Sequence, residues 1–137
     1  TVRSFFERIP DGRYVATVGG KQDGTAVRNY GLARIAAGSA NEGFRNVATG
    51  YRIEPSMLDR PLSVSDLGGA QAYTALLDAA ARAADTQNTA ESYLSLAVLH
   101  DANGQRDAAE TALKSARDRG LEAALLDKFV LRFAQAR

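Results

Sequence analysis

The chain has 137 residues, of which 45% are hydrophobic and 24% charged, and its formal net charge is +1. These values are typical of one globular domain, and the sequence lacks the long apolar run of a membrane span and the basic clusters of a nucleic-acid-binding protein. Cysteine is absent and His100 is the single histidine, which excludes disulfides, thiolate nucleophiles, the commoner zinc sites and any site that needs two imidazoles.

The N-terminal residues 1–23 predict an irregular segment or a short strand. Pro10-Asp11-Gly12 is typical of a turn, and residues 13–18 alternate between polar and apolar side chains as a strand does. Residues 2–9 are either the hairpin partner of that strand or, like it, part of a pair of short helices. Both arrangements stay open at this point.

Residues 24–57 predict a pair of helices whose small positions are glycine. Ser39 followed by Glu42 is typical of a capping box, and we expect it to open the second helix. Glycine inside a helix costs about 1 kcal/mol relative to alanine, so this pair is expected to be softer than the helices further along the chain. A glycine-rich loop pair with one short helix is the alternative.

The second half of the chain is poor in glycine and predicts regular helices. Residues 54–61 contain two prolines and cannot form a continuous helix, because proline removes a backbone donor and biases the preceding residue towards extended geometry. Residues 70–86 then predict a helix, since their apolar residues form one stripe. The stripe comprises Tyr73, Leu76, Leu77, Ala80 and Ala84.

Three more helices are predicted at residues 90–102, 106–119 and 122–136. Gly104 and Gly120 end the first two, because glycine tolerates the left-handed conformation common after a helix. The last helix is apolar on two faces, with Leu125, Phe129, Phe133, Leu126, Val130 and Leu131. So much apolar surface indicates that another element covers this helix. The candidates are a further repeat, a folded-back segment, a partner, a second copy bound through Phe129 and Phe133, and the neighbouring helices themselves.

The order of large and small residues in these helices resembles the tetratricopeptide repeat (TPR), a helix-turn-helix unit of about 34 residues. The clearest copy spans residues 90–123, and its matching residues are Tyr93, Leu96, Ala97, His100, Gly104, Ala109, Leu113 and Ala116. A weaker copy spans residues 24–57, with Val27, Tyr30, Gly31, Arg34, Gly38, Gly43, Val47, Gly50 and Pro55. Residues 58–89 resemble a degenerate copy that keeps its second helix through Ala72, Leu76 and Ala79, and residues 124–137 form a terminal helix.

This resemblance implies an all-α fold, a short α-solenoid of about two to three helix-turn-helix units in a single domain. In TPR proteins the first helix of each unit lines an inner groove that binds partners. The corresponding residues, which we predict to bind a partner, are Arg28, Asn29, Leu32, Ile35, Glu91, Leu94, Ser95, Val98 and Asp101. Members that grip a peptide carboxylate carry several Lys, Arg and Asn there, whereas the apolar residues of this set suit a partner helix or an extended hydrophobic segment. The alternative is that the chain's own helix at 70–86 or 122–136 fills the groove.

The resulting prediction is a protein-protein interaction module, an adaptor or assembly scaffold, with no catalytic residue, metal or cofactor. Secretion or envelope-assembly scaffolds are reasonable hosts if the chain is bacterial, and the compartment, cytoplasmic or periplasmic, stays open. Oligomerisation through the C-terminal helix is one alternative. An enzyme or ligand-binding module centred on residues 1–60 is another, with Glu7, Asp11, Asp23 and Arg28 as its polar residues.

Overall fold

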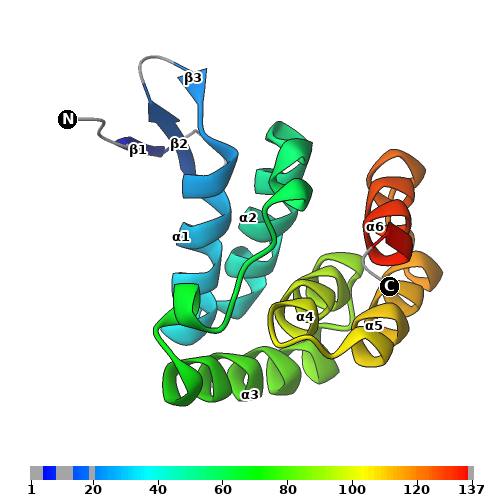
Figure 1. The fold of residues 1–137 in the computed structure, drawn as a ribbon. Helices are drawn as coiled ribbons and strands as arrows, with labels where there is room; N and C mark the ends of the chain where they lie inside the picture. The colour runs from blue at the N-terminus through cyan, green and yellow to red at the C-terminus, as the bar shows by residue number, and fades with distance from the viewer. Residues whose placement is uncertain (1–4, 9–13, 19–20, 136–137) are drawn as a thin grey trace.

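The computed structural model describes residues 5–8, 14–18 and 21–135, with side chains from residue 23 onward. The fold is all-α, and its six described helices pack together as successive hairpins, with a small sheet at the N-terminal end (Figure 1). The helices are α1 (Gly24–Ala36), α2 (Ala40–Ile53), α3 (Ala70–Gln87), α4 (Ala90–Ala102), α5 (Arg106–Asp118) and α6 (Ala123–Gln135). The strands are β1 (Phe5–Arg8), β2 (Tyr14–Val18) and β3 (Lys21–Gln22), and two short 3-10 helices, η1 (Pro55–Asp59) and η2 (Ser65–Leu67), lie between α2 and α3.

The N-terminal sheet is antiparallel and has the strand order β1-β2-β3. Phe5 pairs with Thr17 and Arg8 pairs with Tyr14, which confirms the hairpin between the first segment and residues 13–18. The predicted turn at residues 10–12 lies outside the described residues. The sheet leads directly into α1, whose N-terminus is capped by Asp23, because the Asp23 carboxylate accepts a hydrogen bond from the backbone N of Ala26 at 3.2 Å.

Helices α1 and α2 form the first hairpin, and glycine lies wherever their backbones meet. A Cβ atom placed on Gly24 would lie 2.5 Å from the carbonyl oxygen of Gly50, and one placed on Gly31 would lie 2.6 Å from that of Gly43. The reverse distances are 2.6 Å from Gly50 to the oxygen of Gly24 and 2.5 Å from Gly43 to the oxygen of Gly31. Each glycine is therefore required by the close backbone approach, which is the physical reason for glycine in the interior of these helices.

The start of α2 differs from the prediction. Ser39 is the N-cap residue, but its side chain makes no capping hydrogen bond, and Glu42 forms an ion pair with Arg34. The capping box expected at Ser39 and Glu42 is therefore wrong. The two-helix prediction for residues 24–57 is confirmed, and the alternative of a glycine-rich loop pair with one short helix is wrong.

Helices α4 and α5 form the second hairpin, and alanine and leucine fill its interior. Ala97 of α4 and Ala109 and Ala116 of α5 are completely buried in the core. Thr89 opens α4 with a capping box, in which the Ser92 backbone N donates to Thr89 Oγ1 and the Thr89 backbone N donates to Ser92 Oγ, both at 3.1 Å. Gly104 ends the first helix with a φ of +68°, in the left-handed region expected for glycine.

A long connection and α3 join the two hairpins. The connection, residues 54–69, is called the strap below; it contains η1 and η2 and ends at Gly68 and Gly69, both with a φ of +96°. Met57 of the strap is fully buried, so the strap is part of the core. Helix α3 then passes below the first hairpin in the view of Figure 1 and runs alongside α4 in the opposite direction. The buried Tyr73 hydroxyl near its start donates a hydrogen bond to the carbonyl oxygen of Leu99 near the end of α4, at 2.7 Å.

Candidate functional site

Most residues predicted to line the inner groove are buried in the core. Leu32, Ile35, Leu94, Ser95 and Val98 each expose no more than a small fraction of their surface, and Ser95 Oγ donates to the carbonyl oxygen of Glu91 at 2.9 Å. Apart from Leu32, which borders a groove described below, these side chains are covered by other parts of the same chain, so the prediction that they face an open groove is wrong.

Helices α2 and α3 pack against α4, and the strap and α6 complete its cover near Val98. Val98 borders a small internal cavity together with Met57 and Leu58 of the strap and Phe129 of α6. The two helices considered from the sequence as covers, α3 and α6, both contribute, whereas the strap was not considered. The apolar residues of the proline-bounded segment, among them Met57, were the signal that could have identified it.

Three of the predicted residues share an open groove on the other side of the strap. We name it the α1–α3 groove; its volume is about 590 Å³. It lies between α1, the strap and α3, and it brings together the predicted residues Arg28, Asn29 and Leu32. Its lining is completed by Thr25, Ala33, Ala36, Arg60, Leu62, Asp66, Leu67, Ala72 and Leu76.

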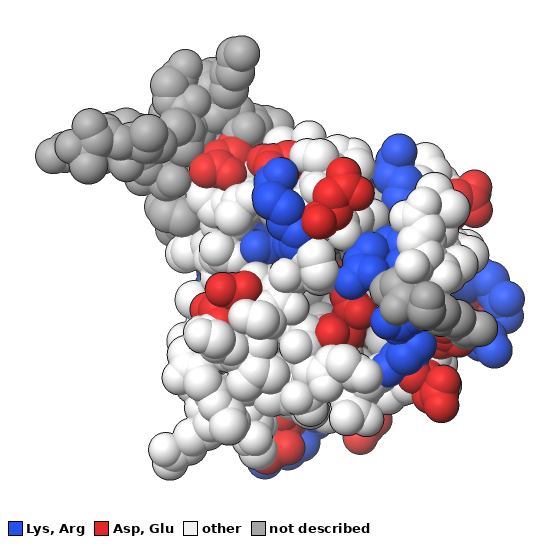
Figure 2. Space-filling view, viewed as in Figure 1, with Lys and Arg blue, Asp and Glu red and all other residues white. Residues whose placement is uncertain are grey.

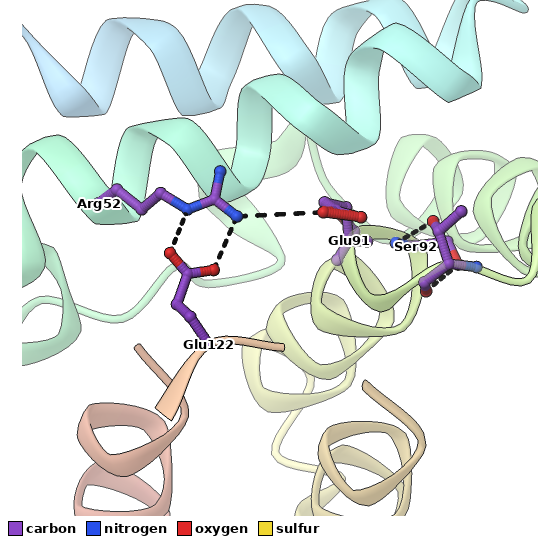
Figure 3. A network of polar contacts seen from close by, with 6 residues as sticks. Arg52, Glu91, Ser92 and Glu122 are labelled. Atoms are coloured by element: carbon purple, nitrogen blue, oxygen red, sulfur yellow. Dashed lines mark hydrogen bonds and ion pairs between the residues drawn. The ribbon is translucent and has the colours of Figure 1, made fainter. Parts of the chain in front are cut away.

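The acidic residues Glu91 and Asp101 lie elsewhere and form ion pairs. The Glu91 carboxylate lies 4.0 Å from Arg52 Nη2, and Arg52 also makes two hydrogen bonds to Glu122, of 2.7 Å and 2.9 Å (Figure 3). This network ties α2 to α4 and to the start of α6. The hydrogen bonds from Arg52 lower the pKa of Glu122 and raise that of the guanidinium.

Asp101 pairs with Arg132 of α6, with 3.4 Å between its Oδ2 and Arg132 Nη2. Neighbouring His100 is half-buried, and burial lowers its pKa because desolvation disfavours the imidazolium. Both observations assign a structural role to the end of α4, and neither places the imidazole against a carboxylate as general acid-base chemistry requires.

The last helix hides the two aromatic residues that were predicted to mediate self-association. Phe129 is 1% exposed and Phe133 is 2% exposed. The ring centroid of Phe129 lies 5.0 Å from that of Tyr51 in α2, in an edge-to-face arrangement, and 6.0 Å from that of Phe133. Self-association through Phe129 and Phe133 is therefore wrong, because both rings are buried within the chain, Phe129 against α2 and Phe133 against Phe129.

A second groove lies between α5 and α6, and apolar side chains remain exposed beside it. This α5–α6 groove has a volume of about 380 Å³. Val130 and Leu131 are 51% and 59% exposed and are the large apolar side chains that the described surface leaves open to solvent. The groove is lined by Leu113, Leu126, Val130, Phe133 and Ala134, with Glu110, Lys114 and Arg117 at its rim.

The face seen in Figure 2 has no large patch of a single charge. Acidic and basic side chains are interspersed over it, and a largely uncharged area lies at its lower left, where α3 runs (Figures 1 and 2). Among the side chains that are described, no group of three His, Cys, Asp or Glu could hold a metal ion. Each helix of the described ranges is too short or too polar to cross a membrane.

Comparison with known proteins adds no relative, since no protein family, no curated protein and no solved structure matches the chain. The functional argument therefore depends on the two grooves alone.

Proposed function

We propose that this chain is a TPR-like protein-protein interaction module and that its α5–α6 groove binds an amphipathic helix of a partner. The observation that carries the proposal is the exposure of Val130 in the lining of a groove that is apolar with charged residues around it, with the exposed Leu131 next to Val130 in the chain. Contiguous exposed apolar surface favours a binding site, because leaving it in water is unfavourable. A groove between two helices suits a third helix that inserts side chains at positions three and four residues apart.

We propose this surface, and not the inner groove, as the partner-binding site of an adaptor or assembly scaffold. The inner side is already covered by the chain itself, since Met57 of the strap is buried beside Val98. A partner of the α5–α6 groove displaces no part of the chain. Bacterial secretion and envelope-assembly scaffolds remain the proposed hosts of such a module.

Self-association through the exposed face of α6 is the second candidate. The same observation supports it, since Val130 and Leu131 of two copies could cover each other. It differs from the first candidate in its dependence on protein concentration.

The test compares three proteins: the wild type, a Val130→Glu/Leu131→Glu variant and an Ala81→Glu control on the exposed side of α3. Both variants should unfold at nearly the wild-type temperature, because their sites are exposed. We expect a partner in a lysate of the source cells to be captured by the wild type and by Ala81→Glu, and to be lost with the double variant.

Sedimentation velocity over a hundredfold range of concentration separates the two candidates. A mass that doubles in the wild type and stays monomeric in the double variant would assign the surface to self-association. Identical capture by all three proteins, together with a monomeric mass, would contradict both candidates.

A further inference from the structure

Arg28 is a buried cation, with only 4% of its surface exposed. Its Nε donates to Asn29 Oδ1 at 3.1 Å and its Nη1 donates to the Tyr51 hydroxyl at 3.3 Å. The guanidinium also lies over the Tyr51 ring, with its central carbon 5.6 Å from the ring centroid. All of these partners are neutral, and within the described part of the chain Arg28 forms no ion pair and its Nη2 makes no hydrogen bond.

Among the described side chains, the charges near Arg28 do not compensate it. Burial and, to a lesser extent, the charge of Asp101 raise the pKa of Tyr51, but Asp101 is already paired with Arg132. Arg60 of the strap pairs with Glu54 at 3.0 Å. Since desolvating an unpaired charge is costly, the folded chain carries a cation at this position that an anion would stabilise.

Arg28 also lines the α1–α3 groove, so an anion can reach it from solvent. The groove's volume of about 590 Å³ is in the range of small-molecule sites. Asp66 is the carboxylate of this lining, and it accepts a hydrogen bond from the backbone N of Ser63 at 3.0 Å. Most of the other walls are apolar, and the large side chains among them are Leu32, Leu62, Leu67 and Leu76.

We propose that the α1–α3 groove binds an apolar carboxylic acid, whose carboxylate pairs with Arg28 and whose body lies along the leucines. The bond is charge-assisted, and Arg28 Nη2 supplies the donor while Asn29 orients the guanidinium through Nε. The carboxylate belongs either to a free acid or to the C-terminus of an apolar peptide. This site is separate from the α5–α6 groove and does not depend on the function proposed for it.

The first test uses octanoate and octanamide, which differ only at the head group. We expect octanoate to bind the wild-type protein at least about tenfold more tightly than octanamide, since a hydrogen bond to a charged group contributes about 1.5–3 kcal/mol. Chemical-shift changes in ¹H-¹⁵N spectra should include Arg28 Nε and the amides of residues 60–67. The peptide N-acetyl-Ala-Leu and its C-terminal amide test whether the natural ligand is a peptide or a free acid. If the peptide binds more tightly than octanoate, the ligand is a peptide C-terminus; if octanoate binds more tightly, it is a free acid.

The variants Arg28→Met and Arg45→Met locate the site, Arg45 being exposed on α2. Arg28→Met should lose octanoate binding, whereas Arg45→Met should keep it. Equal affinity for octanoate and octanamide, or full octanoate binding by Arg28→Met, would overturn the proposal. If Arg28→Met does not fold, the comparison of acid and amide on the wild-type protein still decides.

Discussion

The two helical hairpins of this protein have the same architecture and opposite interiors. In α1–α2 the helices approach until glycine is the one residue that fits, because a single Cβ atom would meet backbone 2.5–2.6 Å away. In α4–α5 the corresponding space is filled by side chains, with Ala97, Ala109 and Ala116 completely buried. Helix pairing can therefore be stabilised by backbone contact or by methyl groups. We expect an added methyl group to destabilise the first hairpin and a removed methyl group to destabilise the second.

The largest expected effect is that of adding a methyl group to the glycine hairpin. A Cβ at position 43 would lie 2.5 Å from the Gly31 carbonyl oxygen and 2.8 Å from Ile35 Cγ1. Overpacking of this kind costs about 1–3 kcal/mol or more and outweighs the gain of about 1 kcal/mol in helix propensity. We expect Gly43→Ala to lower the free energy of unfolding by about 2 kcal/mol in urea titrations. An unchanged or raised stability would show that the helices move apart at little cost and would remove the contrast between the hairpins.

The reciprocal change removes a methyl group from the alanine hairpin. Ala109→Gly should destabilise by about 1.5–2 kcal/mol, since it loses both helix propensity and a buried methyl group. Ala81→Gly on the exposed side of α3 supplies the reference for propensity alone, about 1 kcal/mol. Equal losses at the two positions, measured by the same titrations, would mean that the Ala109 methyl contributes nothing to packing.

The two hairpins also differ in how their helices begin. Thr89 caps α4 through its Oγ1, whereas the Ser39 side chain makes no capping bond to α2. Thr89→Ala should therefore lower stability by about 1 kcal/mol, and Ser39→Ala should change it by no more than a few tenths. Thermal unfolding of both variants measures the difference, and the comparison fails if the serine variant loses as much as the threonine variant.

The smallest expected effect concerns the ion pair that joins the first hairpin to α6. Arg52 lowers the pKa of Glu122 from its ordinary value of 4.5, so the pair stabilises the fold above that value and the contribution disappears as the pH falls through the lowered pKa. Both side chains are more than one third exposed, so we expect Glu122→Gln to cost about 0.5 kcal/mol at pH 7. The difference from wild type should vanish once the pH has fallen below the lowered pKa of Glu122, and it should shrink in 1 M salt. A difference that stays constant as the pH is lowered through the acid range would exclude the ion pair as its cause.

The sequence predicted the helices well, because the evidence for them is local. The glycine stops and the apolar stripe placed α3, α4, α5 and α6 within about a residue of their observed ends. The glycines of α1 and α2 were recognised as small positions of a helix pair, but they were interpreted as a source of softness. Their role in backbone contact depends on which helix lies opposite, and that is a tertiary property.

The candidate site was predicted less well, for the same physical reason. The pattern placed Leu94 and Val98 on a helix face correctly, but it could not show that the strap and α6 cover that face. The strap has no periodicity, so its buried Met57 gave no directional signal. Arg28 was predicted as a partner-binding residue, but its burial became visible only in the three-dimensional structure, where no described carboxylate pairs with it.

The contact between Tyr51 and Phe129 has a consequence for how the chain is made. The nearby pair Arg52–Glu122 is separated by 70 residues, and synthesis at about 5–20 residues per second takes roughly 4 to 14 seconds to cover that distance. During that interval the first hairpin is complete while the side of Tyr51 that α6 later covers is exposed. The nascent chain therefore presents a transient apolar surface at α2, and that surface is closed only when α6 has been made.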